Sequence, residues 1–146
     1  MNSTSKRIYL SLLVVLAVFV GLWAAAWPDG FYSAFPGFGL HWVSSDGPYD
    51  EHLVRDVGAL YLGLGAASLV AIFSRSAIPA RMIGLGWTVF NLLHLGYHVF
   101  HLDGSTVDRV GTVVSLGLAT VLGILLLLPA RVPATIVAST SKAVLR

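Results

Sequence analysis

The feature that most constrains how this chain can fold is its division into four long apolar segments. The predicted helices cover residues 8–27, 49–73, 79–101 and 106–128. Each segment has about 20 residues or more, the length that an α-helix needs to span the hydrocarbon core of a bilayer. In the whole chain 56% of the residues are hydrophobic and 11% are charged, whereas soluble domains carry about 25% charged residues. The sequence therefore predicts an all-α integral membrane protein, with four transmembrane helices in one antiparallel bundle over residues 1–146.

The first apolar segment also has features of a signal peptide. Lys6 and Arg7 precede it, and residues 24–26 are alanines that offer a cleavage site. The hydrophobic core of a signal peptide usually has about 7–15 residues, whereas this segment approaches the ~20 residues needed to span a bilayer. We therefore interpret it as a retained first helix.

Charged residues are distributed unevenly between the two predicted sides of the bundle. Arg55 and Arg109 fall on one side with all seven acidic residues, and the five histidines lie there or in the adjoining half. The remaining basic residues fall on the other side: Lys6, Arg7, Arg75, Arg81, Arg131, Lys142 and Arg146. Because basic residues flank the cytoplasmic ends of membrane helices, both termini are predicted to be cytoplasmic. We expect a multi-pass protein of the plasma membrane (the bacterial inner membrane) whose polar site faces outside.

The composition excludes several kinds of chemistry and partner. The chain contains no cysteine, so disulfides, cysteine nucleophiles and cysteine-bound metals are ruled out. Its net charge is +2 and its basic residues are scattered, so we expect no nucleic-acid partner. A transporter is disfavoured because the inner half of the predicted bundle offers no polar path.

Local signals mark where some helices begin. Pro79 suits the first turn of the third helix. Ser105 or Thr106 can cap the fourth helix, and Asp108 lies close to its positive end. Glu51 and Arg55 are four residues apart, so they are expected to pair on the helix surface.

A loop over residues 28–48 follows the first helix on the predicted outer side. It is rich in glycine, proline, serine and aromatic residues, among them Phe35 and Trp42. Tryptophan and tyrosine favour the membrane–water interface, and connections of this length are often lids or binding loops. We expect the loop to lie over the mouth of the bundle, either as a functional cover or as a plug that only packs. His41, within it, is expected to be exposed.

The third predicted helix carries a polar stripe near its outer end. Asn91, His94, His98 and His101 repeat at i, i+3, i+7 and i+10, which places them on one face of a helix. Polar side chains in a membrane helix are costly unless they face the protein interior or a wet cavity. The stripe therefore indicates a site.

The second predicted helix offers further polar groups. His52 and Asp56 are four residues apart, and the same face continues through Ala59 and Gly63. Small residues mark the faces on which membrane helices approach closely, so we expect His52 and Asp56 to point into the bundle. Helices joined by a short turn are usually antiparallel neighbours, which predicts that His98 faces Asp56.

Three kinds of chemistry fit these residues. The first is a divalent transition metal (zinc, copper or iron) bound by His52, Asp56, His94, His98 and His101, since imidazole and carboxylate groups ligate such ions. The second is metal-free acid–base catalysis by His98 and Asp56 on a small lipophilic substrate. The third is a haem between two histidines such as His52 and His98, which ranks lowest because nothing in the sequence selects it.

A purely structural role competes with all three. Histidine and asparagine side chains can hydrogen-bond across helices, each bond contributing about 0.6 kcal/mol. The chain would then be a non-enzymatic subunit of a larger membrane complex. Gly117 and Gly123 on the fourth helix also leave room for a homodimer. The leading hypothesis is an outer-leaflet metal site that acts on a lipophilic substrate, with enzymatic activity left open.

Several short motifs also resemble those of a known group of proteins. They are Phe35-Pro36-Gly37, Gly47-Pro48-Tyr49, the segment from Glu51 to Gly58 and the segment from His94 to His101. With them the chain resembles small four-helix bacterial membrane proteins of the actinobacterial type, which are loosely similar to DoxX-like proteins. The resemblance covers most of the chain and implies the fold but no activity. DoxX-like proteins have been linked to redox and quinone-related roles, and no cysteine or motif here carries such a role over.

Overall fold

A computed structural model describes residues 3–129 of the chain. Strands β1 (Pro36–Gly37) and β2 (Leu40–His41) form an antiparallel hairpin between the second and third helices. The helices are α1 (Thr4–Ala26), α2 (Pro28–Ala34), α3 (Glu51–Phe73), α4 (Ile78–Phe100) and α5 (Thr106–Leu127). The prediction of a mostly helical chain is confirmed. The segment predicted as a loop over residues 28–48 instead contains α2 and the hairpin.

Three of the described helices, α1, α3 and α5, are long and apolar enough to cross a membrane. This finding indicates a helical membrane protein. Helix α4 has the same length as α1 and α3, 23 residues, but Arg81, Asn91 and two histidines lower its apolar content. A fourth span stays a prediction, as does the orientation, which was inferred in part from Arg131, Lys142 and Arg146, outside the described residues.

The predicted helix starts are confirmed at α4 and α5. Pro79 lies in the first turn of α4. At α5, Ser105 and Asp108 form a capping box: the Asp108 N–H donates to Ser105 Oγ over 3.3 Å, and the Ser105 N–H donates to Asp108 Oδ2 over 3.1 Å. These bonds satisfy backbone donors that a helix start leaves open. The expected surface pair also forms, with Arg55 Nε 2.8 Å from Glu51 Oε1.

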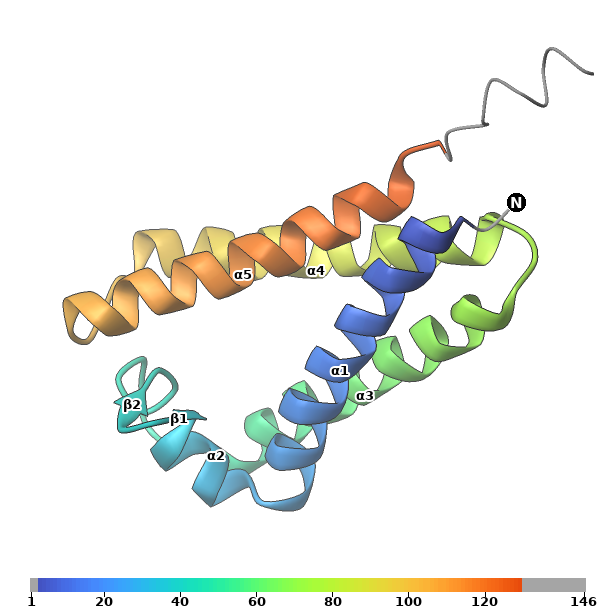
Figure 1. Ribbon diagram of the computed structural model, residues 1–146. Coiled ribbons are helices and arrows are strands. Elements are labelled where there is room, and N and C mark those ends of the chain that lie inside the picture. The colour runs from blue at the N-terminus through green and yellow to red at the C-terminus, as the bar shows by residue number, and fades with distance from the viewer. Residues whose placement is uncertain (1–2, 130–146) are drawn as a thin grey trace, which may run out of the picture.

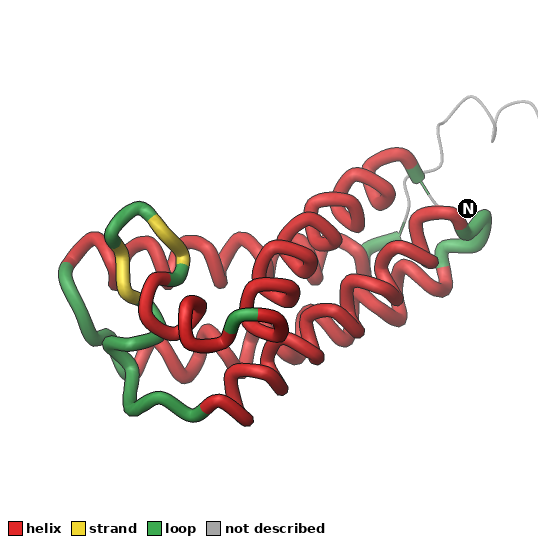
Figure 2. The backbone as a smooth tube through the Cα atoms, turned by 90° about the horizontal axis from the view of Figure 1, so that it is seen from below, coloured by secondary structure: helices red, strands yellow, loops and turns green. Residues whose placement is uncertain are grey.

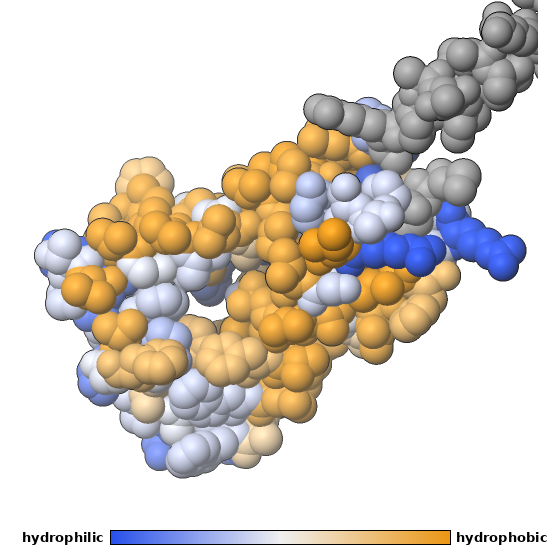
Figure 3. All heavy atoms as spheres, viewed as in Figure 1, coloured by the Kyte–Doolittle hydropathy of each residue, from blue (hydrophilic) through white to orange (hydrophobic). Residues whose placement is uncertain are grey.

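The two ends of the molecule hold different elements. The hairpin end carries α2, the β1–β2 hairpin and the connection from α4 to α5, whereas the N-terminal end carries the connection from α3 to α4 (Figure 1). Figure 2 shows the hairpin close to α2, at the end opposite the N-terminus. Apolar residues cover the helices along their length, and hydrophilic residues gather at the two ends (Figure 3). This distribution suits a molecule whose middle lies in lipid.

Helices α1 and α3 form the first of two tightly packed pairs. A Cβ atom on Gly58 would lie 2.6 Å from the backbone nitrogen of Ala25, and one on Gly65 would lie 2.7 Å from Ala17 Cβ. Any side chain at these positions would push the helices apart. The two glycines therefore set the close approach of α3 to α1.

Helices α4 and α5 form the second pair in the same way. A Cβ atom on Gly84 would lie 2.6 Å from Leu126 Cβ, and one on Gly123 would lie 2.9 Å from Thr88 Oγ1. These two glycines set the close approach of α4 to α5. At Gly117, by contrast, a Cβ atom would meet no other atom within 4 Å. Of the two glycines suggested for a dimer, Gly123 is therefore already used within the chain.

The predicted packing face of α3 is wrong. Ala59 and Gly63 lie on the exposed side of the helix, whereas the buried face runs through Val54, Gly58, Tyr61, Gly65 and Ser68. Small residues occur on both faces, and those at Gly58 and Gly65 meet α1. The helix is thus turned by about one residue, or about 100°, from the predicted orientation.

The two helix pairs meet toward the N-terminal end and diverge toward the hairpin end (Figure 1). Lys6 Nζ donates to the carbonyl oxygen of Leu126 over 2.7 Å, which joins α1 to the last turn of α5. Trp87 Nε1 donates to Ser68 Oγ over 2.9 Å, which joins α4 to α3. Trp87 is fully buried, with Leu10 and Leu13 of α1 in the same apolar cluster. The part of the core that both pairs share therefore lies where the pairs converge.

Candidate functional site

The polar stripe of α4 forms as predicted for three of its four members. The ring of His94 lies between its neighbours, 5.4 Å from the Phe90 ring and 4.9 Å from the His98 ring, measured between centroids. Asn91, one turn earlier, is fully buried. Along α4 the stripe runs from two half-buried histidines to the buried amide of Asn91, so polar side chains extend into the apolar middle of the molecule.

His101 lies apart from this stripe. It is the C-cap of α4, with φ −129° and ψ 70°, so the helix has ended at this residue. Its ring stacks on Tyr97 at 4.2 Å, and its Nδ1 lies 2.9 Å from the Tyr97 carbonyl oxygen. The side chain is exposed and belongs to the rim of the site.

The amide of Asn91 is one of the buried polar groups in the described part of the chain that have an atom without a hydrogen-bond partner. Its Nδ2 donates to the carbonyl oxygen of Trp87 over 2.8 Å, and its Oδ1 has no partner within residues 3–129. Exchanging the two amide atoms would set two oxygens against each other, so the Trp87 carbonyl determines the orientation. A buried acceptor without a partner costs about 1–3 kcal/mol. Such a group is a candidate contact for a bound molecule.

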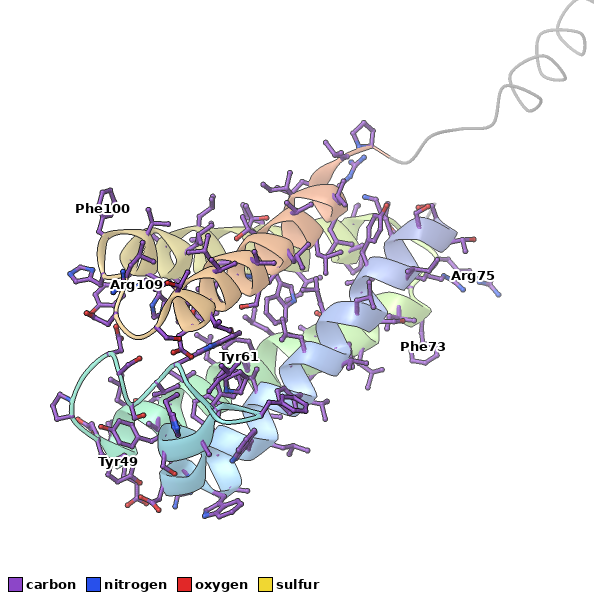
Figure 4. All side chains as sticks on the ribbon, turned by 60° about the vertical axis from the view of Figure 1, so that its left-hand side comes forward. Tyr49, Tyr61, Phe73, Arg75, Phe100 and Arg109 are labelled. Carbon is purple, nitrogen blue, oxygen red and sulfur yellow. The ribbon has the colours of Figure 1, made fainter. Side chains whose placement is uncertain are left out.

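Aromatic side chains from both helix pairs surround this part of α4. Tyr61 of α3 lies 5.8 Å from the Trp87 ring and 5.4 Å from the Phe90 ring, in edge-to-face arrangements. In Figure 4 Tyr61 lies in the middle of the molecule, whereas Tyr49, Phe100 and Arg109 lie at the hairpin end. Tyr61 of α3 therefore packs beside the stripe, against Trp87 and Phe90 of α4.

His52 and Asp56 do not point into the bundle, and this prediction is wrong. Their side chains are 89% and 64% exposed, and His52 Nε2 lies 3.2 Å from Asp56 Oδ2. Within residues 3–129, Asp56 forms no ion pair with His98. The cause is the rotation of α3, because its packing face follows Gly58 and Gly65 and leaves the His52–Asp56 face outward.

A small polar cavity of about 10 Å³ lies at the hairpin end, above the stripe. A volume of this size is close to what one water molecule requires. His98 is one of its lining residues, so the cavity adjoins the stripe. The others include Trp42, Asp46, His101, Asp103, Asp108, Arg109 and Thr112.

Trp42 closes this cavity from the hairpin side. Its ring packs on α5 so closely that a Cβ atom on Gly111 would lie 2.5 Å from Trp42 Cζ2. On the other side it contacts Phe35, with ring centroids 5.9 Å apart. The expectation that the loop covers the mouth of the bundle is borne out at this residue. Our sequence interpretation missed the partner, although a glycine in the first turns of α5 was a possible signal.

The complete metal-ligand set expected from the sequence is not assembled. Within residues 3–129 no group of three or more histidine, aspartate or glutamate side chains is arranged to hold a metal ion. The structure brings together His94 and His98, places His101 at the rim and leaves His52 and Asp56 on the surface. His41 is exposed, as expected, with Nδ1 2.8 Å from the Ser33 carbonyl oxygen. Metal and haem binding stay untested hypotheses.

Comparison with known proteins adds no independent guide to this site. No protein-family model, no curated protein and no solved structure matches the chain. The resemblance to small four-helix bacterial membrane proteins therefore stays a prediction.

Proposed function

We propose that this chain is a four-span membrane protein that binds a small lipophilic molecule between its two helix pairs. The polar group of the molecule contacts Asn91, His94 and His98, and its apolar part lies against Tyr61 and Phe90. Helix α4 is the fourth span in this proposal, both termini are cytoplasmic, and the site lies in the outer half of the membrane.

The observation that carries the proposal is the unpaired Oδ1 of the fully buried Asn91, on the same stripe as two half-buried histidines. A group of this kind destabilises a membrane helix unless something satisfies it. A bound molecule with a hydrogen-bond donor does so. Binding sites for small molecules typically combine apolar walls with a few polar groups, and Tyr61, Trp87 and Phe90 supply such walls.

The divergence of the helix pairs supports the same proposal. In Figure 3 an opening separates the α4–α5 pair from the lower part of the molecule, toward the hairpin end. Apolar residues border much of this opening, as expected for a route through which a lipophilic molecule enters from the bilayer.

A bound metal ion is the second candidate. His94 and His98 are four residues apart and their ring centroids are 4.9 Å apart, so two imidazoles on adjacent turns face the same space. Imidazole suits zinc, copper and iron, and a catalytic site leaves positions for water or substrate. After incubation with Zn²⁺ and removal of free metal, less than about one-tenth of an equivalent per chain would exclude tight binding.

Ligand extraction tests the main proposal. Wild-type protein, Asn91→Leu and His94→Leu are purified in mild detergent, and bound small molecules are extracted with organic solvent and quantified by mass spectrometry. Leu93→Ala is the matched control, because Leu93 is on the same helix and is 73% exposed. We expect one compound in wild type and in the control, reduced about tenfold in the two site variants, since one hydrogen bond to a buried group contributes on that scale.

Two outcomes contradict this expectation. The same compound at equal amounts in all four proteins would indicate binding at the lipid-facing surface. No compound enriched over the surrounding lipids in wild type would favour the structural role, in which the stripe serves only the contact between helices.

A further inference from the structure

We infer that the two helix pairs pivot about the N-terminal end of the molecule, and that Trp42 is the latch that holds the hairpin end closed. Opening the latch exposes the polar cavity beside His98 to the hairpin side. The role of this opening in ligand entry rests on the proposed function, whereas the movement itself does not depend on any ligand.

Each helix pair is built to move as a unit. Gly58 and Gly65 bring α3 into backbone contact with α1, and Gly84 and Gly123 do the same for α4 and α5. Close backbone contact over the length of two helices resists relative motion. Contacts between the two pairs are much sparser than contacts within each pair, so the weak point is between them.

The contacts that join the pairs are concentrated away from the hairpin end. Lys6 Nζ donates to the Leu126 carbonyl oxygen over 2.7 Å, and both residues are buried at the N-terminal end. The hydrogen bond from Trp87 to Ser68 joins α4 to α3 near the middle. A pivot at this end moves the hairpin end most, because displacement grows with distance from the pivot.

The hairpin is attached to the α1–α3 pair. Tyr32 Oη donates to the Gly47 carbonyl oxygen over 2.7 Å, and His41 Nδ1 lies 2.8 Å from the Ser33 carbonyl oxygen. Phe35, at the end of α2, contacts Trp23 of α1 and Trp42 of the hairpin, with both ring distances 5.9 Å. These contacts tie the hairpin to α2 and α1.

Trp42 connects the α1–α3 pair to the α4–α5 pair. Its ring lies against the bare backbone at Gly111, and the backbone of β2 residue His41 lies near the Asp108 carboxylate of α5. Trp42 Nε1 and Asp108 Oδ1 are both buried without a hydrogen-bond partner in the described residues. The Trp42 ring is therefore held on α5 by packing, with no hydrogen bond from the indole within the described residues, and the only polar group of this strand near α5 that we identify is the His41 backbone beside Asp108.

Thiol labelling tests the latch, since the natural chain has no cysteine. Thr112→Cys places one thiol on a buried residue that lines the cavity. Its reaction with a charged methanethiosulfonate reagent is timed in nanodiscs, where both faces of the membrane are accessible. The labelling rate of Thr112→Cys alone is compared with the rates of three double variants, in which Gly111→Ala, Trp42→Ala or Gly117→Ala is added. Gly117 is the control because it lies on the same helix with open space beside it.

We expect Gly111→Ala and Trp42→Ala each to raise the labelling rate about tenfold, a factor within the energy of an aromatic contact, and Gly117→Ala to leave it unchanged. Equal rates in all four proteins would overturn the latch. Thermal unfolding of each protein identifies a variant that has lost its fold, and Trp42→Ala carries the test if Gly111→Ala fails to fold.

Spin labels test the pivot directly. Cysteines at the exposed Leu53 and Val110 report the distance between α3 and α5 at the hairpin end, and cysteines at Phe73 and at Leu128, the residue after α5, report it at the N-terminal end. With Gly111→Ala we expect longer distances for the first pair and unchanged distances for the second. Unchanged distances for both pairs, or equal increases for both, would overturn the pivot. Either result leaves the ligand-extraction test of the proposed function unaffected.

Discussion

Replacing Asn91 with leucine separates a binding role of the stripe from a structural one. The two side chains have the same number of heavy atoms and both branch at Cγ, so the substitution removes the polar amide without opening a cavity. It also removes one hydrogen bond, from Asn91 Nδ2 to the Trp87 carbonyl. We predict that Asn91→Leu stabilises the ligand-free protein, although it removes this bond.

The magnitude follows from the two amide atoms. The lost hydrogen bond is worth about 1 kcal/mol, and the average for such bonds in membrane proteins is about 0.6 kcal/mol. The unpaired Oδ1 of a fully buried residue costs about 1–3 kcal/mol, and this cost disappears in the variant. The net expectation is a gain of about 1 kcal/mol in the free energy of unfolding. Polar groups kept at the expense of stability are typical of functional sites.

Ser68→Ala is predicted to have the opposite effect on the free energy of unfolding. Ser68 Oγ accepts the hydrogen bond from the indole N–H of the fully buried Trp87 over 2.9 Å. Removing this acceptor leaves a buried donor unpaired, so we expect a loss of about 1–3 kcal/mol. Both variants are compared with wild type by equilibrium unfolding in mixed micelles, after bound small molecules have been extracted. A loss of more than about 1 kcal/mol for Asn91→Leu would refute the reasoning, because Oδ1 would then have a structural partner.

Three further predictions concern packing, the surface pair and topology. Gly65→Leu should lower the midpoint temperature of unfolding strongly, since its Cβ atom would lie 2.7 Å from Ala17 Cβ of α1. Gly63→Leu should change this temperature little, because there is open space beside Gly63. Similar effects from both variants would mean that α3 is oriented differently. Asp56→Ala should change the free energy of unfolding by less than about 1 kcal/mol, as expected for an exposed contact between side chains, here with His52, and a larger loss would show that this face is buried by a partner. In intact cells a membrane-impermeant thiol reagent should label Ser45→Cys directly but Ser76→Cys only after permeabilisation, and the reverse pattern would invert the proposed orientation.

Features that depend on local composition and spacing could be predicted from the sequence alone. Long apolar segments predict helices of membrane-spanning length whatever surrounds them, and the structure has helices close to the predicted boundaries. Ser105 and Asp108 cap α5 because a capping box needs only residues three positions apart. Asn91, His94 and His98 share a face because the helical repeat alone puts them there.

Which faces of the helices meet could not be predicted in this way, because it depends on how the helices pack. Helix α3 carries small residues on two faces, and the sequence pattern favoured the face with Ala59 and Gly63. The face with Gly58 and Gly65 is used because the backbone of α1 fits against it, and this fit depends on both helices at once. The His52–Asp56 pair consequently lies on the surface and not in the site.

The contact between Trp42 and Gly111 has the same origin. The two residues are far apart in the chain, and neither one alone indicates the other. Periodicity describes one helix at a time, and in lipid no gradient of polarity turns a helix toward its partner. Steric fit between particular side chains and bare backbone makes that choice, so it becomes visible only when the helices are placed together.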